Sequence, residues 1–151
     1  MNGEYGPEET AKISIFDRGF IFGDGVYEVV PVVVGKLVDR DYFLERLDRS
    51  LSELSITWPC SQREYLDIMQ ELISRNKLEE GFVYSQVTRG IADRDFVFPA
   101  DTAPSLVAFT SQMNLLNNPL AESGIAVSTS EDIRWKRRDI KSVNLLAQCL
   151  A

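Results

Sequence analysis

The chain has 151 residues, 44% hydrophobic and 26% charged, a size and composition typical of one globular domain with its own core. It contains no histidine, which excludes catalytic pairs and metal sites built on imidazole, and its two cysteines are too few for a zinc site. Sixteen basic residues against 23 acidic ones give a net charge of −7, which disfavours nucleic acid and favours a small molecule or another protein as partner.

Neither a membrane span nor a secretory leader is expected. No apolar run approaches the roughly 20 residues of a transmembrane helix, and the N-terminus lacks a basic region followed by a long apolar run. The isolated cysteines, Cys60 and Cys149, fit a reducing compartment. We therefore predict a cytoplasmic protein without a membrane partner.

The first third of the chain contains two expected strands. Lys12–Phe16 alternates in strand fashion, and Asp17–Gly25 reads as a glycine-punctuated loop. Val26–Val34 is dense in β-branched residues and is the clearest strand of the chain. Pro31 within it has no N–H group to donate, which predicts a sheet edge or a bulge.

Apolar residues at helical spacing predict two amphipathic helices. The first runs from Asp39 or Asp41 to about Ser55, and the second follows the capping box Ser61–Glu64 and stops before Gly81. Their apolar stripes are Phe43, Leu44, Leu47, Leu51 and Leu54 in the first helix, and Leu66, Met69, Leu72 and Ile73 in the second.

Three further strands are expected at Phe82–Thr88, Leu106–Thr110 and Ile125–Ser130, with a long polar loop, Arg89–Pro104, between the first two. Strands on both sides of two consecutive helices favour an α+β fold. We predict a mainly antiparallel sheet flanked on one side by the two amphipathic helices.

A lysine close to the end of the chain is the strongest candidate for chemistry. Lys141 follows the basic run 134–138, lies between Ile140 and Val143, and is expected to open an apolar helix. An apolar environment and neighbouring cations both favour the neutral amine. Such an amine can act as a nucleophile or form a Schiff base, although a solvated basic stretch is the alternative interpretation.

Four blocks, in order and spacing, resemble the N-terminal half of the fold-type-IV pyridoxal-phosphate aminotransferases, the family of the D-amino-acid and branched-chain aminotransferases. The blocks are FDRGFIFGDGVYEVV from Phe16, FLERLDRS from Phe43, YSQVTRG from Tyr84 and EDIRWKRRDIKSVNLL from Glu131. The resemblance implies an N-terminal α+β domain at 1–130 and an inter-domain segment at 131–151. The family's C-terminal cofactor domain would lie outside this chain.

The resemblance also implies roles for single residues. Lys141 would form the Schiff base with pyridoxal 5′-phosphate and shuttle a proton between the substrate and the cofactor. Arg46 would grip the cofactor phosphate with its planar fork of donors, unless it is an exposed helix charge. Tyr27 would lie near the cofactor and the substrate carboxylate, unless it is an ordinary strand aromatic.

Arg94 matches an arginine that helps to trap the substrate carboxylate across the dimer interface in the D-amino-acid enzymes. Phe96 stands where those enzymes have a histidine, which removes a donor from the trap. Phe96 is compatible with an apolar substrate or with a simple cover over the site. Glu28 and Arg134 are candidates for a pair that orients the site, or for ordinary surface ion pairs.

The predicted function is transfer of an amino group between an amino acid, D-amino acids included, and a 2-oxo acid. The protein would use pyridoxal phosphate and act as a homodimer, without nucleic acid. A lyase of the same fold, such as aminodeoxychorismate lyase, is one alternative. A catalytically incompetent fragment that self-associates through an apolar face is the other.

Overall fold

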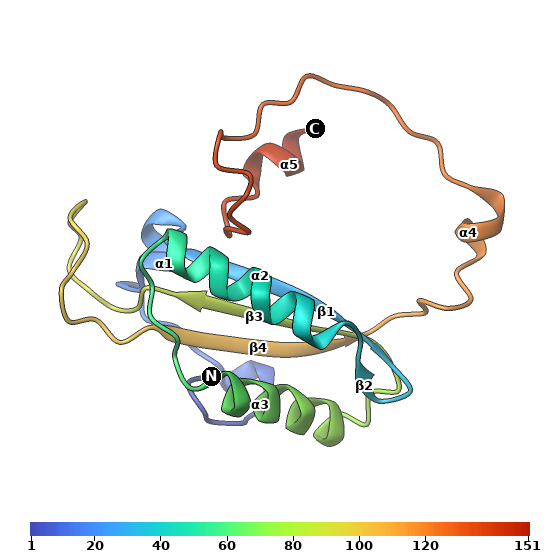
Figure 1. Ribbon diagram of the computed structural model, residues 1–151, viewed down its shortest axis with the longest axis horizontal. Helices are drawn as coiled ribbons and strands as arrows, with labels where there is room; N and C mark the ends of the chain where they lie inside the picture. The colour runs from blue at the N-terminus through green and yellow to red at the C-terminus, as the bar shows by residue number, and fades with distance from the viewer.

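A four-stranded antiparallel sheet forms the centre of the computed structural model, which describes residues 1–151 (Figure 1). The strand order is β2-β1-β3-β4, and each neighbouring pair is antiparallel. The strands are β1 Gly25–Val33, β2 Lys36–Leu37, β3 Glu80–Thr88 and β4 Ser105–Gln112. Together with the helices, this sheet confirms the predicted α+β fold.

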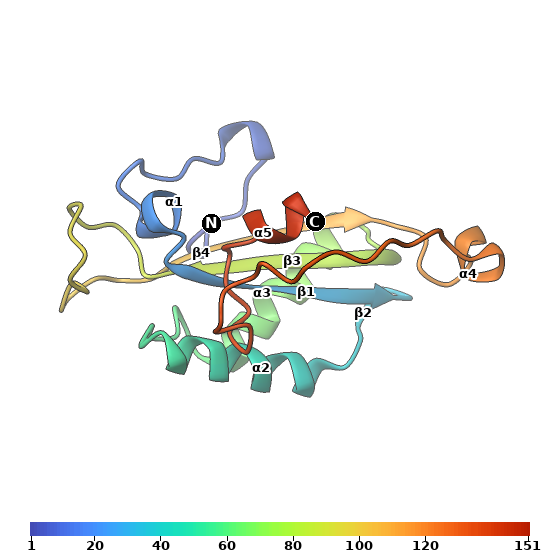
Figure 2. The ribbon, with the colours of Figure 1, turned by 90° about the horizontal axis from the view of Figure 1, so that it is seen from above.

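Two long helices, α2 (Arg40–Glu53) and α3 (Gln62–Arg75), form the core with the sheet. Figure 2 shows α2 on one side of the sheet, and α1 (Arg18–Phe22) and α5 (Leu146–Leu150) on the other. The remaining elements are a 3₁₀ turn at Glu8–Thr10 and the short helix α4 (Pro119–Ser123). None of these helices has the length and apolar character needed to cross a lipid bilayer.

The core follows from the two periodicities of the sequence. Alternate residues of β1 and β3 point to the same face and meet the apolar stripes of α2 and α3, which removes both surfaces from water. The most buried members are Val26, Val30 and Val32 of β1, Val83 and Val87 of β3, Leu47 and Leu51 of α2, and Tyr65, Met69 and Ile73 of α3.

The two long helices begin differently. Ser61 Oγ accepts a hydrogen bond from the Glu64 N–H at 3.2 Å, and the Glu64 carboxylate accepts one from the Ser61 N–H at 2.8 Å. These two bonds confirm the capping box of α3. Asp39 precedes α2 at a φ of 51° and makes no side-chain capping bond, so α2 begins without an aspartate cap.

Pro31 lies in β1 where the missing N–H group does little harm. Its carbonyl accepts from the Val38 N–H at 2.9 Å, so its nitrogen faces the side of β1 that the two-residue strand β2 only partly covers. The expected edge or bulge is not found, since β1 is an inner strand and its register with β3 continues through Pro31. The proline is tolerated there because β2 pairs with β1 only at Val32 and Val33.

Four expected elements differ in the structure. Lys12–Phe16 and Ile125–Ser130 are not strands, because neither segment pairs with an edge of the sheet. The glycine-punctuated loop contains the short helix α1, which Asp17 caps by accepting a hydrogen bond from the Gly19 N–H at 2.8 Å. The helix expected to open at Lys141 begins instead at Leu146.

Candidate functional site

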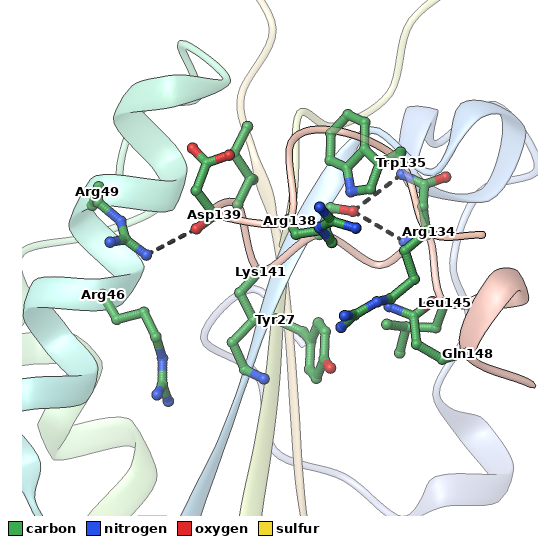
Figure 3. Close-up of a pocket in the computed structure, with 13 residues that line it drawn as sticks. Tyr27, Arg46, Arg49, Arg134, Trp135, Arg138, Asp139, Lys141, Leu145 and Gln148 are labelled. Atoms are coloured by element: carbon green, nitrogen blue, oxygen red, sulfur yellow. Dashed lines mark hydrogen bonds between the residues drawn. The ribbon is translucent and has the colours of Figure 1, made fainter. Parts of the chain in front are cut away.

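An open cavity of about 310 Å³ lies between α2, β1 and the segment from Arg134 to Gln148 (Figure 3). Three of the four residues singled out in the sequence line it: Tyr27 from β1, Arg46 from α2, and Lys141. They come from separate parts of the chain, and the cavity is where the fold brings them together.

Lys141 lies beside the N-terminal part of β1, which β2 does not cover. Its carbonyl accepts from the Tyr27 N–H at 3.0 Å, and the Val143 N–H donates to the Gly25 carbonyl at 3.1 Å. Its own N–H donates to Ser50 Oγ of α2 at 3.3 Å. These contacts, with the bridge between Val26 and Ser142, explain why this segment is not helical.

A second contact fixes the same segment to the turn before β1. Asn144 Nδ2 donates to the Gly23 carbonyl at 2.9 Å. Gly23 has a φ of 66° at the end of α1, and a side chain there would collide with Asn144. The turn at Gly23 and the segment that carries Lys141 are therefore joined in one structural unit.

The Lys141 amine faces an aromatic wall. Its Nζ lies 4.1 Å from the centre of the Tyr27 ring, within the range of a cation–π contact. The Tyr27 ring stacks on Tyr84 at 5.7 Å, and Tyr84 stacks on Phe109 at 4.8 Å. Burial raises the pKa of Tyr84, and the neighbouring Tyr27 acts in the same direction, so its hydroxyl stays neutral and donates to Gln86 at 2.9 Å.

Arg46 is oriented by a buried carboxylate. Glu28 is fully buried and accepts from Arg46 Nε at 2.9 Å and Nη2 at 2.5 Å, while the Arg46 side chain remains 46% exposed. The hydrogen-bonded carboxylate raises the pKa of Arg46 above its ordinary value against the opposing effect of burial. Two of the five guanidinium N–H groups are engaged in this way, which leaves the others free for a ligand.

Glu28 therefore pairs with Arg46 and not with Arg134, the partner considered from the sequence. Arg134 donates instead to the half-exposed carboxylate of Asp132, at 2.9 Å from both Nε and Nη2. The ordinary surface ion pair is the correct interpretation for Arg134.

The cavity is strongly basic although the chain is acidic. Five of its lining residues are cationic and one is anionic: Arg46, Arg49, Arg134, Arg138 and Lys141 against Asp139. A concave site of one sign attracts ligands of the other sign, so phosphate and carboxylate groups suit it. The sequence analysis missed Arg49, although its spacing of three from Arg46 places both on one helix face.

Arg94, the fourth predicted site residue, does not line this cavity. It lies on the loop between β3 and β4, with its guanidinium 5.5 Å from the centre of the Phe22 ring and 5.4 Å from that of Phe96. Phe96 itself is 77% exposed. The proposed role of Arg94 across a dimer interface therefore stays a prediction.

Comparison with known proteins places most of the chain in one family. The family described as "Amino-transferase class IV" matches residues 25–151. D-alanine aminotransferase of Staphylococcus aureus (strain MSSA476) is 41% identical over 152 residues, which cover 100% of this chain and 54% of that protein. The chain thus spans about half the length of the curated relatives it matches.

Solved structures share the fold at lower identity. 4-Amino-4-deoxychorismate lyase from Pseudomonas aeruginosa superposes with a TM-score of 0.80 at 23% identity, over 94% of this chain and 52% of the other. The branched-chain amino acid aminotransferase of Escherichia coli gives 0.71 at 17% identity, over 80% and 41%. Another branched-chain enzyme of this fold was solved with pyridoxamine 5′-phosphate. These likenesses identify the fold, and they do not distinguish a lyase from an aminotransferase.

Proposed function

Since the chain belongs to the class IV amino-transferase family, we propose that it carries the lysine-bearing half of a pyridoxal-phosphate-dependent aminotransferase. The reaction would move an amino group between an amino acid and a 2-oxo acid. The observation that carries the proposal is the Lys141 amine at the wall of a basic cavity that also exposes Arg46. A primary amine beside anion-binding guanidiniums suits an aldehyde cofactor that bears a phosphate.

The residues present fit that cofactor. Lys141 would bind it covalently as a Schiff base, and Arg46, held by Glu28, would bind its phosphate. When bound, pyridoxal phosphate supplies an electron-withdrawing ring that stabilises negative charge at the substrate α-carbon. The Lys141 amine would take up and return the α-proton, and the Tyr27 ring, whose centre lies 4.1 Å from Nζ, would limit where the amine can move.

D-Alanine is the substrate that the relatives' name suggests, and we propose it as the amino donor. Arg94 would then bind the substrate carboxylate from the partner subunit of a homodimer. Phe96, which offers no hydrogen bond, favours an amino acid with a small apolar side chain over a polar one. A cytoplasmic location belongs to the same proposal.

Reductive trapping tests the assignment of Lys141. The protein is incubated with pyridoxal phosphate, reduced with borohydride and digested, and the modified peptide is identified by mass. We expect one adduct, on Lys141, and none in Lys141→Ala. Lys36→Ala, which removes an exposed lysine of β2, is the matched control and should keep the adduct. A wild-type protein without an adduct, or with adducts spread over surface lysines, would contradict the proposal.

Dependence on an acceptor separates the aminotransferase from the lyase of the same fold. With D-alanine as donor, we expect more than one equivalent of product per bound cofactor only when a 2-oxo acid such as 2-oxoglutarate is present, because the cofactor can hold the amino group once and must pass it on before the next turnover. Repeated turnover of an amino substrate without any 2-oxo acid would support the lyase instead.

A further inference from the structure

Two buried arginines share one carboxylate at the end of the sheet remote from β2. Asp24 accepts from Arg18 Nε at 2.8 Å, and from Arg89 Nε at 2.7 Å and Nη2 at 3.0 Å. The three side chains are 7% exposed or less. Asp17, the other buried acid nearby, is occupied by Gly19, Thr88 and Ser105.

Arg18 and Arg89 therefore have only the Asp24 carboxylate as an ionic hydrogen-bond partner, and backbone carbonyls accept from their remaining donors. Arg89 donates to the Leu54 carbonyl at 2.7 Å and to that of Ser55 at 3.0 Å. Arg18 Nη1 donates to the Asp95 carbonyl at 2.6 Å. Such charge-assisted bonds are short and strong, and a buried guanidinium that loses its acceptor is strongly penalised.

The bond from Arg18 is the only hydrogen bond that joins residues 93–104 to the rest of the chain. Its acceptor, Asp95, is the residue directly after Arg94. The Phe98 ring covers the Arg89 guanidinium at 3.7 Å, so the network contacts the same loop at a second point. On the other side, Phe22 of α1 contacts both Arg18 and Arg94, at 4.7 and 5.5 Å from its ring centre.

From this arrangement we infer that Arg18 is a positioning residue for Arg94. Anchored on Asp24, it holds the Asp95 carbonyl and thereby fixes the stretch 93–98, here called the Arg94 loop. The inference rests on the proposed function, in which Arg94 binds the substrate carboxylate. Arg18 does not line the cavity, and its effect on the reaction would be transmitted through the loop.

Arg18→Lys tests this role, because lysine keeps the charge beside Asp24 but lacks the second N–H group that reaches the loop. We expect the amides of the Arg94 loop to exchange hydrogen at least about tenfold faster, while those of β1 and β3 do not change. The KM for D-alanine should rise roughly tenfold or more at unchanged kcat. Arg75→Lys, on the exposed face of α3, is the control and should alter neither quantity.

A second measurement separates positioning from general damage. In an Arg94→Gln background, Arg18→Lys should add no further increase in KM, because the group it positions is already missing. Unchanged exchange in the Arg94 loop, or a full additional KM increase in that background, would overturn the inference. If the wild-type protein does not use D-alanine at all, the proposed function fails, and loop exchange in Arg18→Lys alone decides the positioning role.

Discussion

At the scale of single residues, two glutamates form salt bridges of the same kind in opposite surroundings. Glu28 is fully buried against Arg46, whereas Glu53 is 45% exposed against Arg137. We predict that Glu28→Gln lowers the free energy of unfolding by about 1–3 kcal/mol, because a charged bond inside the protein is lost. Glu53→Gln should leave it unchanged within error, since water replaces the partner. Urea unfolding of both variants measures the difference, and equal effects would contradict the structure.

The buried network makes stability depend on pH through Asp24. Burial alone would raise the pKa of its carboxyl, but hydrogen bonds from Arg89 and Arg18 outweigh that effect and lower it. The folded state then binds the proton less tightly than the unfolded state. This contribution to stability is therefore complete above the ordinary carboxyl pKa of about 4 and is lost as the pH falls through the lowered value.

Asp24→Asn should accordingly be less stable than the wild type by about 3 kcal/mol at pH 7, because two buried cations lose their counter-charge. The deficit should shrink as the pH falls from about 4 through the lowered pKa of Asp24, below which the folded wild-type carboxyl is also neutral. Urea unfolding across that range measures it. Asp41→Asn, at an exposed position of α2, should match the wild type throughout. A deficit that does not vary with pH would contradict the assignment.

At the scale of elements, the segment that carries Lys141 is held to β1 by a few polar contacts. We predict that Asn144→Ala, which removes the bond to the Gly23 carbonyl, accelerates hydrogen exchange at the Val143 and Tyr27 amides by about tenfold. Gln148→Ala is the matched control, since Gln148 lines the same cavity without a side-chain hydrogen bond. Equal exchange in both variants would show that Asn144 does not fix the segment.

Elements whose sequence signal is local could be predicted. The capping box of α3 and the β-branched run of β1 act within a few residues. The start of α3 after Ser61 and the strand at Val26–Val34 were therefore predicted correctly. Ile125–Ser130 has the same strand-forming composition without a partner edge, and pairing is a long-range property that composition does not contain. The short helix α1 was missed because its glycines indicate a loop, although Asp17 is a cap signal.

The site was predictable only in part. The order of the four sequence blocks singled out Tyr27, Arg46 and Lys141, and the structure places all three at one cavity. The pairing of Glu28 with Arg46 joins a strand to a helix 18 positions along the chain, and no local pattern encodes it. The same holds for Arg18, whose acceptor lies 77 residues away.

At the scale of the whole molecule, the sheet face opposite α2 carries an aromatic row with little cover. Phe109 is 49% and Val29 37% exposed, and Tyr27 and Tyr84 continue the surface towards Lys141. Contiguous apolar surface of this kind binds hydrophobic dyes and promotes association. We predict that the 151-residue chain binds such a dye and sediments faster as its concentration rises.

Phe109→Gln should weaken both properties, because it interrupts the row at its most exposed ring. Tyr42→Gln is the matched control: Tyr42 is 75% exposed, but it lies alone on the outer side of α2, where a single aromatic attracts no partner. Dye fluorescence and sedimentation velocity measure the two effects. If the chain stays monomeric and binds no dye, the aromatic face is too small or too polar at its borders to bind a second copy of the chain. The self-associating alternative would then be excluded, and the row would matter only as the wall of the Lys141 cavity.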